Sequence, residues 1–227
     1  MINFDIPKEI EKAIRHHHSG KIREAEAIYK KILEIQPNHP DALHLSGVIA
    51  LQSGRFDAAA DQIRQAIQHS PDNPICHSNL GAAYMSLNRP DEAIASYQKA
   101  VALKPDFAEA YHNLGAALNS RNRWEEALFC FEKAVQIKPD FVVAHRKMGD
   151  TLRQLGRPDE AISCYRKTVQ LNPGSADAYY QMGIVLKDQD NADEARSCFQ
   201  KAARIKPNFF NAHIHAGILL QNQGKLY

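Results

Sequence analysis

The chain has 227 residues, of which 44% are hydrophobic and 24% charged, a balance typical of ordinary soluble proteins. Its 28 Lys and Arg residues nearly match its 26 Asp and Glu residues, and a net charge of +2 does not favour nucleic acid or an acidic membrane as a partner. No apolar run is long enough to cross a bilayer, and the first residues lack the regions of a signal peptide, so we expect a cytoplasmic protein.

A period of 34 residues runs through the sequence. Counted from position 1 of each repeat, a proline stands at position 32, an alanine at position 20 and, from the second repeat on, a glycine at position 8. A fixed period in this range predicts a repeat architecture. We therefore expect a single array over residues 1–227. Its full repeats are 6–39, 40–73, 74–107, 108–141, 142–175 and 176–209, and a half repeat covers 210–227.

These columns resemble the tetratricopeptide repeat (TPR), and the resemblance covers nearly the whole chain. It implies an all-α fold, a right-handed α-solenoid (superhelix) of antiparallel helix pairs, in which the first helix of each pair lines the concave side. Arrays of this kind present many different surfaces on one scaffold, so the resemblance says less about function than about fold.

The polar first repeat differs from the central one. Glu9, Lys12 and His16 stand where residues 108–141 carry apolar side chains, as an N-terminal capping repeat requires. Adjacent residues of the run His16, His17 and His18 point about 100° apart on a helix, so they cannot easily share one ion. We predict no metal site there.

Each repeat is predicted to contain two antiparallel helices. In the central repeat, Ala110, Tyr111, Leu114 and Leu118 follow the spacing of one buried stripe. Position 15 holds Gly, Asn or Asp, which tolerate a left-handed backbone and stop the first helix. The second helix begins at position 17 and ends before the proline at position 32. The aromatic residues of position 24 are expected to fill the space between repeats: Tyr97, Phe131, Tyr165 and Phe199.

The last half repeat supplies one apolar helix without a polar cap, including Ile218, Leu219 and Leu220. We interpret the chain as a fragment of a longer protein. The alternative is that a second copy covers this end, which would give a homo-oligomer through the C-terminal half repeat.

The cysteines do not indicate a disulfide, and the sequence contains no known catalytic motif. Cys130, Cys164 and Cys198 share position 23, and equivalent positions in stacked hairpins lie about 10 Å apart, beyond the reach of a disulfide. The sequence has no Gly-rich phosphate loop, no GxSxG and no HExxH. We therefore predict no catalytic residues, no cofactor and no enzymatic activity.

Position 6 of the first helix suggests a peptide-binding groove. It holds Asn79 and Asn113 in the sequences SNLG and HNLG. An amide can donate to a peptide carbonyl and accept from a peptide N–H. The two residues resemble the asparagine ladder in the TPR region of protein O-GlcNAc transferases, although Lys147 and Gln181 break the ladder here. The alternative is that Asn before Leu-Gly is only the consensus residue of the family.

The second half of the predicted groove is more charged, which favours a partner with mixed or acidic side chains. The alternative is a solvated face with internal pairs such as Arg146 with Asp150. The candidate groove residues are His44, Asn79, His112, Asn113, Asn119, Arg146, Lys147, Asp150, Arg153, Tyr180, Gln181 and Lys187.

Three functions remain open at this point. The first is a non-catalytic scaffold that binds an extended peptide or protein segment. The second is the substrate-recognition arm of a larger transferase, because residues 17–50 resemble TPR regions attached to bacterial O-GlcNAc-transferase-like glycosyltransferases, sulfotransferases or methyltransferases. The third is a self-associating assembly module.

Overall fold

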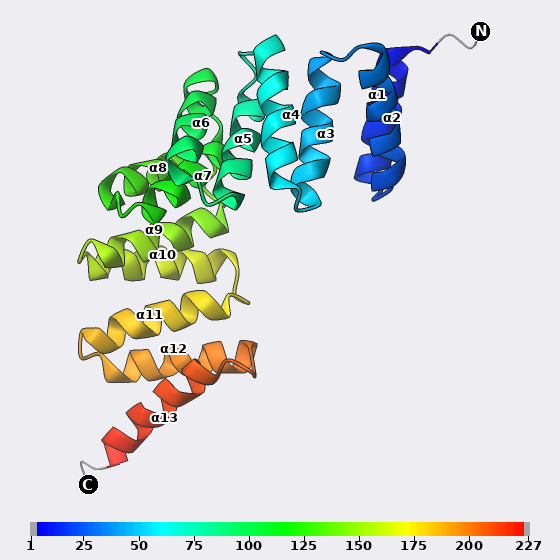
Figure 1. The fold of residues 1–227 in the computed structure, drawn as a ribbon. Helices are drawn as coiled ribbons and strands as arrows, with labels where there is room; N and C mark the ends of the chain where they lie inside the picture. The colour runs from blue at the N-terminus through cyan, green and yellow to red at the C-terminus, as the bar shows by residue number, and fades with distance from the viewer. Residues whose placement is uncertain (1–3, 225–227) are drawn as a thin grey trace. The chain divides into compact units, whose positions relative to one another are not determined.

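The computed structural model describes residues 4–224, and within this range it contains thirteen α-helices and no strand (Figure 1). The first seven helices are α1 Ile6–His18, α2 Ile22–Ile35, α3 Pro40–Gln52, α4 Phe56–His69, α5 Pro74–Ser86, α6 Pro90–Leu103 and α7 Ala108–Ser120. The remaining six are α8 Trp124–Ile137, α9 Val142–Gln154, α10 Pro158–Leu171, α11 Ala176–Asp188, α12 Ala192–Ile205 and α13 Phe210–Gly224.

The helices follow the sequence period. Odd-numbered helices begin at residues 6, 40, 74, 108, 142, 176 and 210, and even-numbered helices begin at 22, 56, 90, 124, 158 and 192. Odd-numbered helices are therefore the first helices of the repeats, and even-numbered helices are the second. The predicted all-α solenoid of helix pairs is confirmed.

The chain forms two compact units, Met1–Ala117 and Leu118–Tyr227, called unit 1 and unit 2 below. In unit 1, each helix from α1 to α5 packs against its successor. In unit 2 the same holds from α8 to α12, and Figure 1 shows α9 to α12 as successive layers. The core of each unit is thus a seam between neighbouring helices rather than one central cluster.

The turn between the helices of a repeat forms as predicted at position 15. Six residues there have positive φ, between 56° and 77°: Gly20, Gly54, Asn88, Asn122, Gly156 and Asp190. In the half repeat, α13 ends at Gly224, which is the last residue that the structure describes, so the turn predicted there stays a prediction.

The alanine column at position 20 lies at the centre of each helix pair. All six alanines are fully buried: Ala25, Ala59, Ala93, Ala127, Ala161 and Ala195. Their small side chains allow the second helix to lie close to the first.

The glycine at position 8 is in close contact with the large side chain at position 24. A Cβ atom placed on Gly183 would lie 2.8 Å from Phe199 Cε1, and one placed on Gly81 would lie 2.7 Å from Tyr97. Gly149 meets Tyr165, and Gly47 meets Ile63, at similar distances. The position-24 side chain therefore packs within the hairpin of its own repeat. Phe199 also stacks on His215 of the next repeat at 5.0 Å, so the predicted packing between repeats is found there as well.

In three repeats, a histidine at position 4 forms a hydrogen bond from the start of the first helix to the preceding loop. His77 Nε2 lies 2.8 Å from the carbonyl oxygen of Pro71 and His145 Nε2 lies 2.9 Å from that of Pro139. The third pair is His213 Nε2 with the carbonyl oxygen of Pro207, at 3.0 Å. In each pair the imidazole N–H donates to a proline carbonyl at position 32, across the junction of two repeats.

Among residues 4–224 there is no helix with both the length and the apolar character needed to span a membrane.

The close contact at position 8 gives a test with an internal control. Gly183→Ala forces a methyl group against Phe199, and overpacking of this kind costs roughly 1–3 kcal/mol. Gly217→Ala meets no atom within 4 Å, so the better helix propensity of alanine should stabilise the protein by up to about 1 kcal/mol. Urea denaturation followed by circular dichroism measures both. Equal midpoints for the two variants would contradict the packing described here.

Candidate functional site

The twelve predicted groove residues all lie on first helices. His44 is buried, and the other eleven are half-buried. By helix, they are His44 on α3; Asn79 on α5; His112, Asn113 and Asn119 on α7; Arg146, Lys147, Asp150 and Arg153 on α9; and Tyr180, Gln181 and Lys187 on α11. The structure thus places these residues at positions 5, 6, 9 and 12 of the first helices, and all of them except His44 are partly open to solvent.

In unit 1 the structure joins two of these residues. Asn79 Nδ2 lies 2.9 Å from His44 Nε2. Burial lowers the pKa of His44, against an opposing effect of Asp41, which favours a neutral imidazole at pH 7. The amide N–H of Asn79 then donates to the ring nitrogen. Position 5 of one repeat thereby contacts position 6 of the next.

In unit 2, Asp150 has a partner at each oxygen. Arg146 Nη1 lies 3.2 Å from Asp150 Oδ2, which is the internal pair that the sequence suggested as an alternative. The hydroxyl of Tyr165 donates to Asp150 Oδ1 at 2.9 Å. Burial, followed by the charge of Asp150, raises the pKa of Tyr165 well above its usual range, so this hydroxyl stays protonated. Asp150 therefore serves as an internal acceptor.

Several polar atoms of the predicted groove residues are buried and have no hydrogen-bond partner among the described residues. Asn119 Oδ1, Arg153 Nε and Gln181 Oε1 are three of them. The other amide atom of Asn119, Nδ2, donates to Thr151 Oγ1 at 2.8 Å. Buried polar groups normally have a partner in the protein or in ordered water. A ligand lying along these helices could supply one.

Arg153 also lines a cavity of about 270 Å³ within unit 2. The other lining residues are Gly156, Pro158, Val185, Asp188 and Gln189. The cavity lies between the end of α9, the start of α10 and the end of α11.

An aromatic cluster surrounds Tyr180. Its ring centroid lies 4.8 Å from that of Phe209 and 5.9 Å from that of His215, and His215 stacks on Phe199 at 5.0 Å. Burial lowers the pKa of His215, and the charge of Lys187 adds to this effect. Tyr180 and His215 repeat the contact between position 5 of one repeat and position 6 of the next.

Sequence analysis missed three apolar residues at groove positions 5 and 9. Ile184 on α11 is half-buried, while Ile214 and Ile218 on α13 are 56% and 47% exposed. The signal was present in the sequence, because position 5 is polar from the second repeat to the fifth and then holds Tyr180 and Ile214. Position 9 holds Ile184 and Ile218 in the same two repeats.

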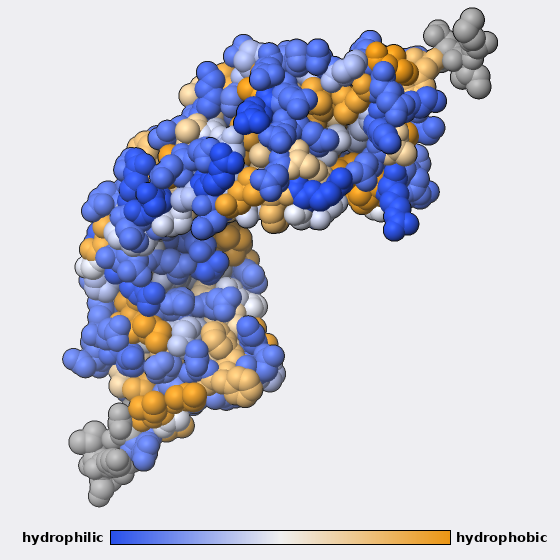
Figure 2. Space-filling view, viewed as in Figure 1, coloured by the Kyte–Doolittle hydropathy of each residue, from blue (hydrophilic) through white to orange (hydrophobic). Residues whose placement is uncertain are grey.

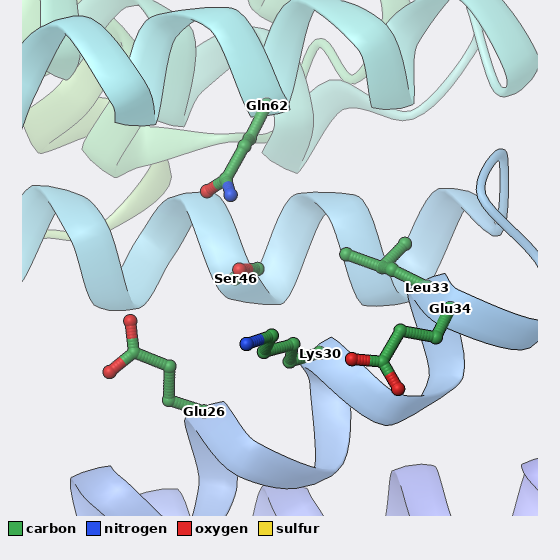
Figure 3. Close-up of a pocket in the computed structure, with 6 residues that line it drawn as sticks. All are labelled: Glu26, Lys30, Leu33, Glu34, Ser46 and Gln62. Atoms are coloured by element: carbon green, nitrogen blue, oxygen red, sulfur yellow. The ribbon is translucent and has the colours of Figure 1, made fainter.

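A second surface lies in unit 1, where α2, α3 and α4 meet around a cavity of about 390 Å³. In Figure 3, the amide of Gln62 points from α4 toward Ser46 and Lys30. Two carboxylates of α2, Glu26 and Glu34, also line the cavity. Arg55 holds Glu26 in an ion pair of 2.6 Å. All of its lining residues except Ser46 lie on the second helices α2 and α4, and none of them is a predicted groove residue.

The four cysteines are free and buried. Burial raises the pKa of the Cys76, Cys164 and Cys198 thiols to about 11 and that of Cys130 to about 12. Because the thiolate is the reactive form, these side chains are inert at neutral pH.

The sequence agrees with known families over most of its length. Four profiles described as tetratricopeptide repeat match residues 11–74, 50–118, 108–141 and 176–209, and a fifth, described as TPR repeat, matches residues 149–190. The chain belongs to the tetratricopeptide repeat family.

Solved structures with the same TPR fold include a crystal structure of MamA, with 30% identity and a TM-score of 0.69 over 71% of this chain and 94% of that chain. YrrB, described as a TPR protein with an unusual peptide-binding site, has 22% identity and a TM-score of 0.72 over 83% and 97%. PilF of Pseudomonas aeruginosa has 20% identity and a TM-score of 0.80 over 96% and 97%.

A comparison with curated protein sequences found no match. The TPR fold and its structural neighbours indicate the architecture of a protein-interaction scaffold, and TPR proteins are generally non-catalytic.

The contact between His44 and Asn79 should make stability depend on pH. Because burial lowers the pKa of His44, the unfolded chain binds a proton near pH 6.5 that the folded chain resists. The contribution of His44 is therefore full above pH 6.5 and is lost as the pH falls toward the lowered pKa. In His44→Gln the amide oxygen can still accept from Asn79, but nothing titrates.

We expect the free energy of unfolding of the wild type to fall below pH 6.5 more steeply than that of His44→Gln, by up to about 1.4 kcal/mol per pH unit. Urea titrations at pH 7.5, 6.5 and 5.5 measure the difference. Parallel curves for the two proteins would show that His44 is not held neutral.

Proposed function

We propose that this TPR chain is a non-catalytic scaffold that binds an extended segment of a partner protein along the predicted groove residues. The observation that supports it best is the row of half-buried polar side chains on successive first helices, with several buried polar atoms left without a partner in the described residues. Such atoms are positioned for the N–H and C=O groups of an incoming backbone.

The groove residues divide into those used internally and those offered to a ligand. Asn79 gives one amide hydrogen to His44, and Asp150 is held by Arg146 and Tyr165. Lys147 and Arg153 have no ion pair in the described part of the chain. We therefore propose that the cations, more than the carboxylates, contact the partner.

We propose that the repeats belong to one array, because the 34-residue spacing between the starts of the first helices is unchanged from residue 6 to residue 210. The transferase-arm hypothesis is compatible with the same groove. It rests on the resemblance of residues 17–50 and on the asparagine pair Asn79 and Asn113, of which Asn79 already uses part of its hydrogen-bonding capacity within the protein.

A pull-down from cell lysate with mass spectrometry tests the scaffold. We expect Asn79→Ala plus Asn113→Ala, and separately Lys147→Ala plus Arg153→Ala, to lower recovery of specific partners roughly tenfold. This is the effect of losing one or two hydrogen bonds to charged or buried groups.

The matched control is Gln98→Ala plus Lys99→Ala on the exposed face of the second helix α6. It should leave recovery unchanged. If both groove variants recover the same partners as the wild type, the binding site lies elsewhere.

A second candidate function, self-association, is favoured by the surface of α13. Phe210 is 75% exposed and Leu220 is 49% exposed, and Figure 2 shows apolar surface at this end of unit 2. A Cβ atom at Gly217 meets nothing within 4 Å, although the equivalent glycines are covered by a position-24 side chain. An apolar helix from a second copy could cover this face.

Self-association predicts a mass that rises with concentration in light scattering. Phe210→Ser plus Leu220→Ser removes two exposed apolar side chains and should hold the protein monomeric. A wild-type monomer at all accessible concentrations would remove this candidate.

A further inference from the structure

The groove of unit 2 changes character along its length, and we propose that it recognises a segment in which one acidic side chain is followed by two apolar side chains, each about three residues further on. This inference rests on the proposed function and specifies the partner. The acidic side chain would contact Lys147 and Arg153 on α9. The apolar side chains would contact Tyr180 and Ile184 on α11, then Ile214 and Ile218 on α13.

The charged part of the predicted groove contains cationic side chains that have no ion pair among the described residues. Asp150 is already occupied by Arg146 and Tyr165, and Asp188 lies 3.6 Å from Lys187 Nζ. Asp177 is exposed at the start of α11, whereas Arg153 lies at the end of α9 and contributes to a cavity with residues from the end of α11. The carboxylates of the protein thus leave Lys147 and Arg153 without an ion pair among the described residues.

Arg153 is suited to an incoming carboxylate. Its Nε is buried without a hydrogen-bond partner in the described residues, and the side chain borders the cavity of about 270 Å³. The planar guanidinium group matches the two oxygens of a carboxylate. A carboxylate at the guanidinium group would satisfy the arginine, because Asp188, which also lines the cavity, forms its ion pair with Lys187. A neutral amide of the same shape would do so poorly.

The apolar part begins one helix further along. The Tyr180 ring is held by Phe209 at 4.8 Å and His215 at 5.9 Å, so its position is fixed before any ligand binds. Ile214 and Ile218 lie four residues apart on α13, on one side of the helix, and are about half exposed. Apolar side chains gathered at groove positions indicate an interaction surface.

The spacing of the helices sets the spacing of the motif. The helices α9 and α11 are in contact, and the rings of Tyr180 and His215 bring α11 against α13. Packed helices lie about 8–10 Å apart. An extended peptide advances about 3.3 Å per residue, so each step from one first helix to the next takes about three residues.

The test uses the full chain and synthetic peptides read by fluorescence anisotropy. The probe is a fluorescein-labelled nonapeptide, Ser-Glu-Ser-Ser-Leu-Ser-Ser-Phe-Ser, together with the same peptide in reversed order, because either chain direction fits the spacing. We expect at least one of them to bind. Replacing Glu by Gln in that peptide should weaken binding about tenfold, and inserting two serines before Leu should weaken it by a similar factor.

Variants of the protein assign each contact. Arg153→Gln should weaken binding of the Glu peptide about tenfold and leave the Gln peptide unchanged, and Lys147→Gln should act in the same direction. Ile184→Ser plus Ile218→Ser should weaken both peptides equally. The control Lys99→Gln lies on the exposed face of α6 and should change neither. Circular dichroism confirms that each variant is folded.

Several outcomes overturn the proposal. They are equal binding of the Glu and Gln peptides, an equal loss for both in Arg153→Gln and in Lys147→Gln, or no binding of either peptide order. In all of these, the lysate pull-down with groove variants can still identify a partner of different sequence. Failure of this inference is therefore distinguishable from failure of the proposed function.

Discussion

The contact between the glycine at position 8 and the large side chain at position 24 sets the close approach of the two helices in the repeats that contain Gly47, Gly81, Gly149 and Gly183. With distances of 2.6 to 2.8 Å from a hypothetical Cβ, a larger residue at these glycines requires the neighbouring side chain to shift. The alanine at position 20 completes the close approach. Because the hairpins repeat this packing, successive first helices present equivalent positions. The predicted groove residues depend on this regularity, since contacts such as that of His44 with Asn79 join one repeat to the next.

Most of the fold could be predicted from the sequence, because it is specified by local chemistry that recurs. Gly, Asn or Asp at position 15 adopts positive φ in all six full repeats. The packing of the position-24 side chain was predicted only in part. It contacts the next repeat, as Phe199 does with His215, and it also packs on the glycine of its own repeat. Column patterns show which residues are buried and leave open which neighbours cover them.

The candidate site was less predictable, because residue type does not reveal whether a polar group is already used within the protein. Asn79 and Asp150 look equally available in the sequence, yet one bonds to His44 and the other to Arg146 and Tyr165. The distinction depends on side chains 35 and 15 residues away. The apolar end of the groove was overlooked because isoleucine in a helix is normally assigned to the core, whereas Ile214 and Ile218 remain about half exposed.

The histidine that bonds to a proline carbonyl has a consequence for folding kinetics. It joins residues only six apart, and the bond between Asn79 and His44 spans 35. Contacts of such short range give a low contact order, for which loop-closure entropy is small and folding is fast. A chain held together in this way can begin to fold at any repeat and can unravel from either end, one hairpin at a time. A bound segment that crosses α9, α11 and α13 would join helices that do not follow one another in the sequence, and would slow that unravelling.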